Sequence, residues 1–252
     1  MRECTRAETV NSFDAMTIPQ SHIPTELYLD FLGRTIQIWN YHAVLMFLIW
    51  MVLVPPSIIS IRYFKPKPTP YGIREKVKLS NTAWWWFHVH KYILYLAIGL
   101  LLVGAAVALA ASHGFSGSVH SMFGILTVVL GCLQVASSWF RGTHGGRYYY
   151  TADPNDPSTW RGDHFNMTLR RRIFEAFHKN VGYFACFFAV GAVTSGLVQF
   201  PMPILTLVML ATALVILALC LVLEYKGRKF DTYRSVFGND PDPPYNKARK
   251  DL

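Results

Sequence analysis

Apolar residues are concentrated in five long runs, at about residues 38–61, 84–111, 117–140, 173–197 and 204–223. Each run is long enough to cross a bilayer core of roughly 30 Å as a helix. An aqueous core could not bury five such runs, so they predict an all-α membrane protein with five transmembrane helices. The membrane domain would occupy residues 38–224, between a polar N-terminal tail at 1–37 and a basic C-terminal tail at 225–252.

Basic residues are distributed unevenly among the connections between the apolar runs. Only 15% of the 252 residues are charged, and the net charge is +9. The connections at 62–83 and 141–172 each hold six Lys or Arg residues, whereas those at 112–116 and 198–203 hold none. This positive-inside pattern places the basic connections and the C-terminus in the cytoplasm and the N-terminus outside. We therefore expect a multi-pass protein of a plasma or inner membrane rather than a nucleic-acid-binding protein.

Cysteine spacing excludes several kinds of site. The four cysteines are isolated, and neither a CxxC pair nor a CxxCH motif occurs. A disulfide framework, a cysteine zinc site and a covalently attached haem are therefore not expected.

Four histidines carry the chemistry of the sequence. His42, His90, His120 and His178 each lie about one turn inside the predicted start of four successive helices. Because consecutive spans run in opposite directions, the first and third histidines share the outer leaflet and the other two share the inner leaflet. A single membrane histidine is often only a hydrogen-bonding residue, but polar groups at this depth are rare. Two axial imidazoles suit a six-coordinate haem iron, so four matched histidines predict two such sites.

The second span contains a competing histidine, His88, two residues before His90. At about 100° per residue, the two side chains leave the helix on nearly opposite faces. The face of His90 continues through small or apolar residues, whereas that of His88 carries Tyr92 and Tyr95. We therefore expect His90 to be the ligand. Small residues also follow His120 and His178, at Gly124, Gly131, Gly182, Ala185, Ala189, Ala192 and Gly196.

The motifs resemble those of the cytochrome b561 family of transmembrane dihaem electron carriers. The first span reads H-x-x-L-M-x-x-x-W from His42, and the second reads W-F-x-x-H from Trp86, which also selects His90. The third has Gly124 and Gln134 at a similar spacing after its histidine, and the fourth reads H-x-x-x-G-Y from His178. The resemblance implies a four-helix bundle with two non-covalent haem b groups and one additional C-terminal helix. His42 and His120 would bind the outer haem iron, and His90 and His178 the inner one.

These observations predict electron transfer across the membrane, from an ascorbate- or quinol-type donor to an unknown acceptor. Cationic residues just before the second span, Arg74, Lys76 and Lys78, are candidates for attracting an anionic donor. One alternative is the cytochrome b subunit of a larger dehydrogenase or hydrogenase. Another is a haem-free transporter or receptor. A homodimer, and whether the chain is an oxidoreductase in its own right, are left open at this point.

Overall fold

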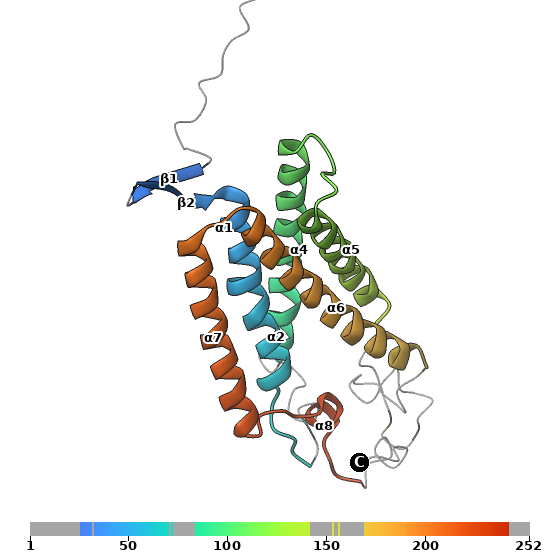
Figure 1. Cartoon of the computed structure of the whole chain (residues 1–252). Helices are drawn as coiled ribbons and strands as arrows, with labels where there is room; N and C mark the ends of the chain where they lie inside the picture. Colours follow the sequence, from blue (N-terminus) through green and yellow to red (C-terminus); the bar gives the residue numbers. More distant parts are fainter. Residues whose placement is uncertain are drawn as a thin grey trace, which may run out of the picture.

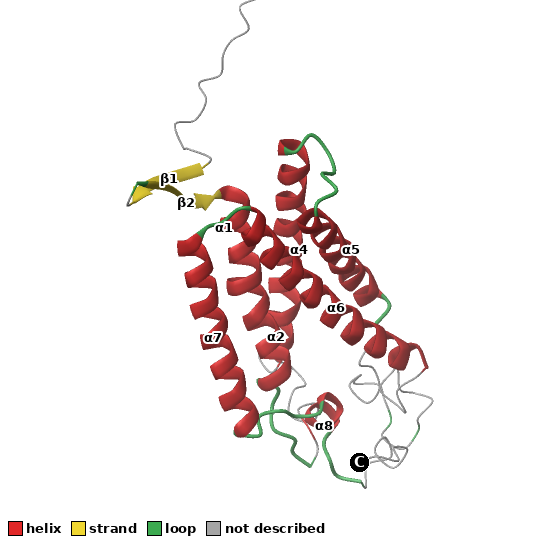
Figure 2. Cartoon of the chain, viewed as in Figure 1, coloured by secondary structure: helices red, strands yellow, loops and turns green. Residues whose placement is uncertain are grey.

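The structure is a computed structural model, and it describes residues 26–31, 33–70, 72, 84–141, 153, 156 and 169–241. Five helical segments are long and apolar enough to cross a membrane: Tyr41–Tyr63, Trp85–Ala111, Val119–Trp139, Leu169–Gln199 and Pro203–Tyr225. They run alternately up and down in Figures 1 and 2. The predicted all-α architecture with five spans is therefore confirmed, and each predicted run overlaps one of these helices.

The first span is built from three consecutive segments: α1 (Tyr41–Phe47), a π-helical segment η1 (Leu48–Leu53) and α2 (Val54–Tyr63). Pro55 and Pro56 lie in the first turn of α2. They have no N–H groups, so carbonyls of the preceding turn lose their usual hydrogen-bond donors. The backbone adjusts by widening, so that the N–H of Val54 donates to Ile49 five residues earlier. The span thus crosses the membrane without a break.

The other spans are single helices: α4 (Trp85–Ala111), α5 (Val119–Trp139), α6 (Leu169–Gln199) and α7 (Pro203–Tyr225). The most extensive packing joins α5 to α6 and α2 to α4, while α7 lies beside the first span (Figure 1). A small apolar core forms where the first span meets α4, around Ile49, Val54, Ala97 and Leu101. Most other apolar side chains of the spans point outward, as a lipid-facing surface requires.

Helix α6 begins before its apolar run. The sequence predicted a start near residue 173, but α6 starts at Leu169 and its first turns carry three consecutive arginines, residues 170–172. Hydropathy marks where a chain meets hydrocarbon, whereas helix hydrogen bonding continues into the polar interface. His178 is therefore the tenth residue of its helix, and His90 the sixth, while His42 and His120 are each the second. The prediction of a uniform depth of one turn was wrong in this respect.

A β-hairpin precedes the first span. Strand β1 (Glu26–Phe31) pairs antiparallel with β2 (Arg34–Asn40), and the turn uses Gly33 at a φ of 72°. The alternation of Leu27, Leu29 and Phe31 is the period-two pattern that favours a strand. The sequence predicts only a polar tail here, so the hairpin is an additional finding.

The segment after α7 returns to the C-terminal end of the first span. It forms the short helix α8 (Thr232–Phe237), whose residues Ser235, Val236 and Phe237 are buried. Beyond α8, the N–H groups of Asn239 and Asp240 donate to the carbonyls of Thr69 and Pro70. The chain therefore links the end of its fifth span to the loop that follows its first.

Candidate functional site

One histidine pair, called the outer pair after the leaflet that the sequence predicts for it, joins the first and third spans. His42 lies at the start of α1, where the Asn40 side chain accepts a hydrogen bond of 2.9 Å from the His42 N–H. His120 lies at the start of α5, which is capped by the Ser118 hydroxyl. The centres of the two imidazole rings are 5.9 Å apart, and the ring planes are nearly perpendicular at 89°. These caps fix the backbone on both sides of the pair.

The ring of His120 is held in one orientation by α6. Its Nδ1 lies 2.8 Å from the carbonyl oxygen of Ala192, which can only accept, so Nδ1 carries the proton. Gly196 passes so close that a Cβ there would lie 2.8 Å from His120 Nδ1. The small residues predicted along α6 therefore include one that makes room for a histidine ring. Among the described residues, the buried Nδ1 atom of His42 has no hydrogen bond of ordinary geometry, and the backbone of Gly104 lies near it.

The inner pair joins the second and fourth spans. The ring centres of His90 and His178 are 6.3 Å apart, with an interplanar angle of 76°. His90 Nδ1 lies 3.2 Å from the carbonyl oxygen of Ser57 in α2, so this nitrogen is also the donor. The backbone carbonyl of His178 accepts a hydrogen bond of 2.9 Å from Gln134 Nε2, which ties α6 to α5.

A serine determines the tautomer of His178. Ser137 Oγ lies 3.4 Å from His178 Nδ1 and donates its own proton to the Gln134 carbonyl at 2.9 Å. The hydroxyl can therefore only accept from His178, which leaves Nδ1 protonated. In three of the four histidines, Nδ1 is thus a donor and Nε2 carries the lone pair. Metal-binding histidines commonly show this arrangement, because the second nitrogen is held by an acceptor.

His88 lies apart from both pairs. Its ring stacks on Tyr92 with 5.8 Å between ring centres and an interplanar angle of 13°. Among the described residues, its buried Nδ1 has no hydrogen-bond partner. The structure therefore brings His90, and not His88, against a histidine of another span.

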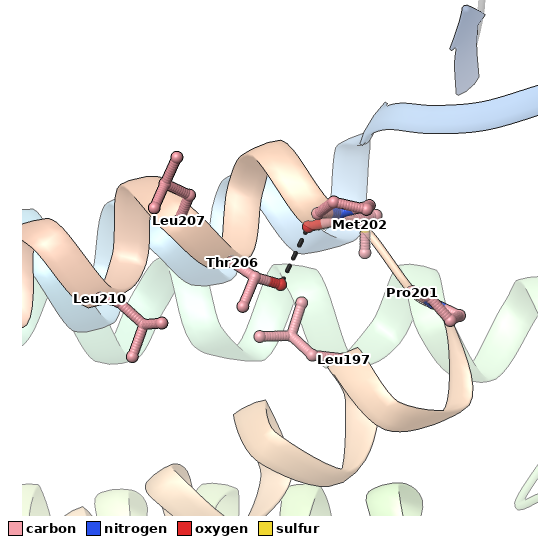
Figure 3. A pocket seen from close by; sticks show the side chains of 7 residues that line it. Leu197, Pro201, Met202, Thr206, Leu207 and Leu210 are labelled. Carbon is pink, nitrogen blue, oxygen red and sulfur yellow. Dashed lines mark hydrogen bonds between the residues drawn. The ribbon is translucent and has the colours of Figure 1, made fainter. Parts of the chain in front are cut away.

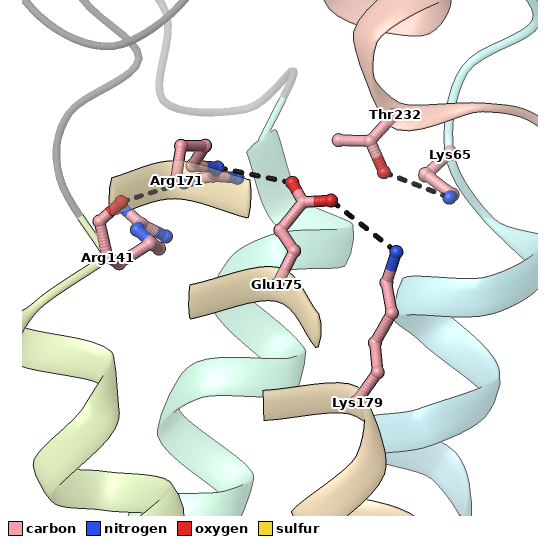
Figure 4. Close-up of polar contacts among 6 residues, drawn as sticks. All are labelled: Lys65, Arg141, Arg171, Glu175, Lys179 and Thr232. Atoms are coloured by element: carbon pink, nitrogen blue, oxygen red, sulfur yellow. Dashed lines mark hydrogen bonds and ion pairs between the residues drawn. The ribbon is translucent and has the colours of Figure 1, made fainter. Parts of the chain in front are cut away.

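Charged side chains lie near His178 of the inner pair, and Figure 4 shows several of them. Glu175 accepts from Arg171 Nε at 3.1 Å and from Lys179 Nζ at 3.4 Å. Phe174 stacks on His178 with a centroid distance of 5.1 Å, and the Arg171 guanidinium lies over Phe174 at 5.5 Å. The inner pair thus sits beneath a mostly cationic layer.

Two cations of this layer have shifted pKa values. Burial, together with the nearby charge of Arg171, lowers the pKa of the Arg141 guanidinium. Burial likewise lowers the pKa of the Lys65 ammonium, and the Asp231 carboxylate partly opposes that shift. Lys65 also donates to the Thr232 hydroxyl of α8 at 3.1 Å. The three residues predicted to attract a donor, Arg74, Lys76 and Lys78, lie outside the described residues.

The two pairs lie at opposite ends of the bundle. Along the first span, His42 is fifteen residues from Ser57, the partner of His90, which corresponds to about 22 Å of helix. Along α6, His178 is fourteen residues from Ala192, the partner of His120, which corresponds to about 21 Å. The two estimates use different helices and agree with each other.

One cavity lies away from the histidine rings. It has a volume of about 400 Å³ and is formed at the turn between α6 and α7 (Figure 3). Thr206 is its polar side chain, and the Thr206 hydroxyl already donates to the Met202 carbonyl at 2.9 Å. The other lining residues are apolar: Leu197, Pro201, Met202, Pro203, Leu207 and Leu210. The cavity therefore offers few polar groups with which to recognise a polar substrate.

Comparison with known proteins gives one consistent result. The chain is 29% identical over 157 residues to a cytochrome b561, DM13 and DOMON domain-containing protein of Arabidopsis thaliana. It is 28% identical over 112 residues to a putative ferric-chelate reductase 1 of Xenopus laevis, and 24% identical over 111 residues to ferric-chelate reductase 1 of Bos taurus. The chain resembles the cytochrome b561 family. The resemblance predicted from the sequence motifs is thus confirmed.

The matches are partial. They cover 62%, 43% and 43% of this chain, in the same order, but only 14%, 18% and 17% of the relatives' own lengths. No family model and no solved structure matches the chain. The chain therefore spans less than a fifth of the length of these relatives.

The donor set fits the b-type haem that a cytochrome b561 resemblance implies. Among the described residues, no group of three or more His, Cys, Asp or Glu side chains could hold a metal ion. Haem needs only two protein ligands, because the porphyrin supplies the other four. When two imidazoles bind opposite sides of one metal, the distance between the ring centres is the sum of two metal–nitrogen bonds of about 2 Å and the distance from each ring centre to its nitrogen. That sum is about 6 Å. The centroid distances of 5.9 and 6.3 Å agree with that sum.

Proposed function

We propose that this chain transfers electrons across a membrane through two non-covalent b-type haems. His42 and His120 would hold the outer iron, and His90 and His178 the inner one. The observation that carries the proposal is the pairing of histidines from alternate spans at both ends of the bundle, with Nδ1 held as a donor in three of the four rings. That arrangement leaves the Nε2 lone pairs of these three rings available to bind a metal.

The residues around each pair determine what chemistry is available. Bis-histidine ligation leaves no open position on the iron, so the bound haems would supply reversible one-electron transfer rather than oxygen binding. The backbone carbonyls of Ser57 and Ala192 and the Ser137 hydroxyl would keep three imidazoles in the ligating tautomer. Gly196 gives the His120 ring its space.

We further propose that the outer pair faces the exterior and the inner pair the cytoplasm, as the distribution of basic residues predicts. The cationic layer around His178 favours an anionic donor such as ascorbate on the inner side, whereas a quinol would reach the protein from within the bilayer. Two of the similar proteins are named ferric-chelate reductases, so a ferric chelate is a reasonable acceptor to test.

The decisive experiment measures haem and its reduction. The purified protein should contain about two haems per chain, and acidified organic solvent should extract both. Anaerobic titration with ascorbate and with a quinol then identifies the donor. A protein without Soret absorption would instead support the transporter or receptor alternative. Co-purification with iron–sulfur subunits would support the dehydrogenase or hydrogenase alternative.

Orientation and donor side need a separate test. In sealed vesicles of known orientation, ascorbate on the inner side should reduce the protein, and the rate should fall with added salt and in Lys76→Ala and Lys78→Ala variants. Arg74→Ala should behave in the same way. Unchanged rates would leave these charges as topology signals and favour a quinol donor.

A further inference from the structure

Arg141 is a cation in an unusual position. It follows the end of α5 and is half-buried, with its guanidinium 4.5 Å from the centre of the Phe87 ring. Its backbone carbonyl accepts a hydrogen bond from Arg171 at 3.3 Å. Within the part of the chain that the structure describes, no carboxylate forms an ion pair with its guanidinium: Glu175, the nearby acid in Figure 4, pairs with Arg171 and Lys179.

A partly buried guanidinium without an anion is energetically unfavourable. Burial lowers the pKa of Arg141, but an arginine side chain stays protonated in proteins. The free-energy cost of burying its charge therefore cannot be removed by deprotonation. Buried charges are normally paired or strongly hydrogen-bonded. Its environment makes the need for an anion greater, because Arg171 adds a second positive charge. The position therefore calls for an anionic group that the described protein residues do not provide.

The inner histidine pair is close to this cation. The charges of Arg141 and Arg171 both act electrostatically on the His178 ring. Phe87, beneath the Arg141 guanidinium, belongs to the same helix as His90 and precedes it by three residues. Arg141 is thus associated with both ligand-bearing helices of the inner pair.

We propose that Arg141 anchors the carboxylate groups of the inner haem. This inference rests on the proposed function. Haem b carries two propionate carboxylates, which avoid hydrocarbon and turn toward the polar end of a membrane site. The planar guanidinium matches a carboxylate in charge and can form two parallel hydrogen bonds with it. A lipid phosphate has the same chemistry, and the experiment distinguishes the two sources.

The test is a thermodynamic cycle on the full chain. In a His42→Ala background, which should keep only the inner site, haem-free protein is titrated with haem b or with its dimethyl ester, whose carboxylates are blocked. Parent protein, Arg141→Gln, Arg141→Lys and Lys179→Gln are compared by absorption. Lys179→Gln is the matched control, because it also removes a cation bound near His178, but from an exposed side chain paired with Glu175.

We expect Arg141→Gln to weaken haem b binding by about 10- to 100-fold, the size of a lost charge-assisted hydrogen bond. Esterification should cause a similar loss in the parent and little further loss in Arg141→Gln. Arg141→Lys should be intermediate, and Lys179→Gln should match the parent. Retention of the outer haem in Arg141→Gln with His42 intact would show that the variant is folded.

Two results would overturn the inference. Parent-like haem b affinity in Arg141→Gln would remove the anchoring role. If Arg141→Gln loses as much affinity on esterification of haem as the parent does, the haem carboxylates do not bind Arg141. The arginine would then pair with another anion, such as a lipid phosphate. Failure of the proposed function would give a different result from failure of the anchoring role. The His42→Ala parent would then bind no haem, or it would still bind haem after His178 is also replaced by alanine.

Discussion

The two histidine pairs have the same side chains and nearly the same ring separation, but their surroundings differ. The groups that contact the outer pair are uncharged: a helix cap, the Ala192 carbonyl and the backbone at Gly196. The inner pair is surrounded by a serine, a stacked phenylalanine and the charges of Arg141, Arg171 and Glu175. Close steric fit is the main feature around the outer pair, whereas polar and charged neighbours are the main feature around the inner pair.

This difference suggests how one bundle could give two unlike redox centres. Axial ligands set the general range of a haem potential, while hydrogen bonds and nearby charge adjust it. Because both proposed haems would have two histidine ligands, any difference between their potentials would come from the surroundings. The following predictions test that contrast.

The largest effects should come from the ligands themselves. His42→Ala and His120→Ala should each remove the outer haem, and His90→Ala and His178→Ala the inner one, so that each variant keeps about one haem per chain. Haem content and the low-temperature absorption spectrum measure the outcome. His88→Ala is the control and should keep both haems. If His88→Ala loses a haem and His90→Ala keeps two, the choice between these histidines must be reversed.

Gly196→Ala should damage the outer site alone. The added Cβ would lie 2.8 Å from His120 Nδ1, so the ring must move from its hydrogen bond with Ala192. Overpacking of this kind costs roughly 1–3 kcal/mol, or about 5- to 150-fold in affinity. Gly99→Ala is the matched control, because a Cβ there meets nothing within 4 Å. Equal haem content in the two variants would contradict the steric argument.

Ser137→Ala should weaken the inner site by removing the acceptor of His178 Nδ1. Loss of such a partner typically lowers metal affinity by about 10- to 100-fold, and this long hydrogen bond places the expected effect at the lower end. Titration of haem-free protein measures it. Ser138→Ala is the control, since the Ser138 hydroxyl donates to the Val135 carbonyl instead. An unchanged inner affinity in Ser137→Ala would assign this serine a purely structural role.

The smallest effect should be that of salt. Raising ionic strength screens charges near the protein surface, so the inner midpoint potential should shift by about 20–60 mV, roughly 0.5–1.4 kcal/mol. The outer potential should change less, because its contacts are uncharged. Spectroelectrochemical titration at low and high salt gives both values in one sample. Equal shifts at the two sites would show that local charge does not distinguish them.

Much of the membrane architecture was predictable from the sequence because hydropathy alone requires it. The second span was expected at 84–111 and is observed at Trp85–Ala111. The separation of His88 from His90 also followed from helix geometry, which places them on opposite faces. Such features depend on residues close together in the chain.

The remaining features depend on contacts between distant residues. Ser57, Ser137 and Ala192 hold histidines that are 33, 41 and 72 residues away. Serines and alanines in membrane helices are too common to mark these roles. The hairpin was missed because a short strand pair leaves a weak pattern. Arg141 was counted only as a topology charge, since its burial appears only in three dimensions.

The return of α8 to the loop at Thr69 and Pro70 also bears on the order in which the molecule is completed. Roughly 170 residues separate these partners, which at ordinary synthesis rates corresponds to about 10–30 s on the ribosome. All four histidines have left the ribosome before α8 is made. A nascent chain can therefore assemble both histidine pairs before α8 is made, and α8 then packs beside Lys65, Thr69 and Pro70 at the end of the bundle that holds His90 and His178.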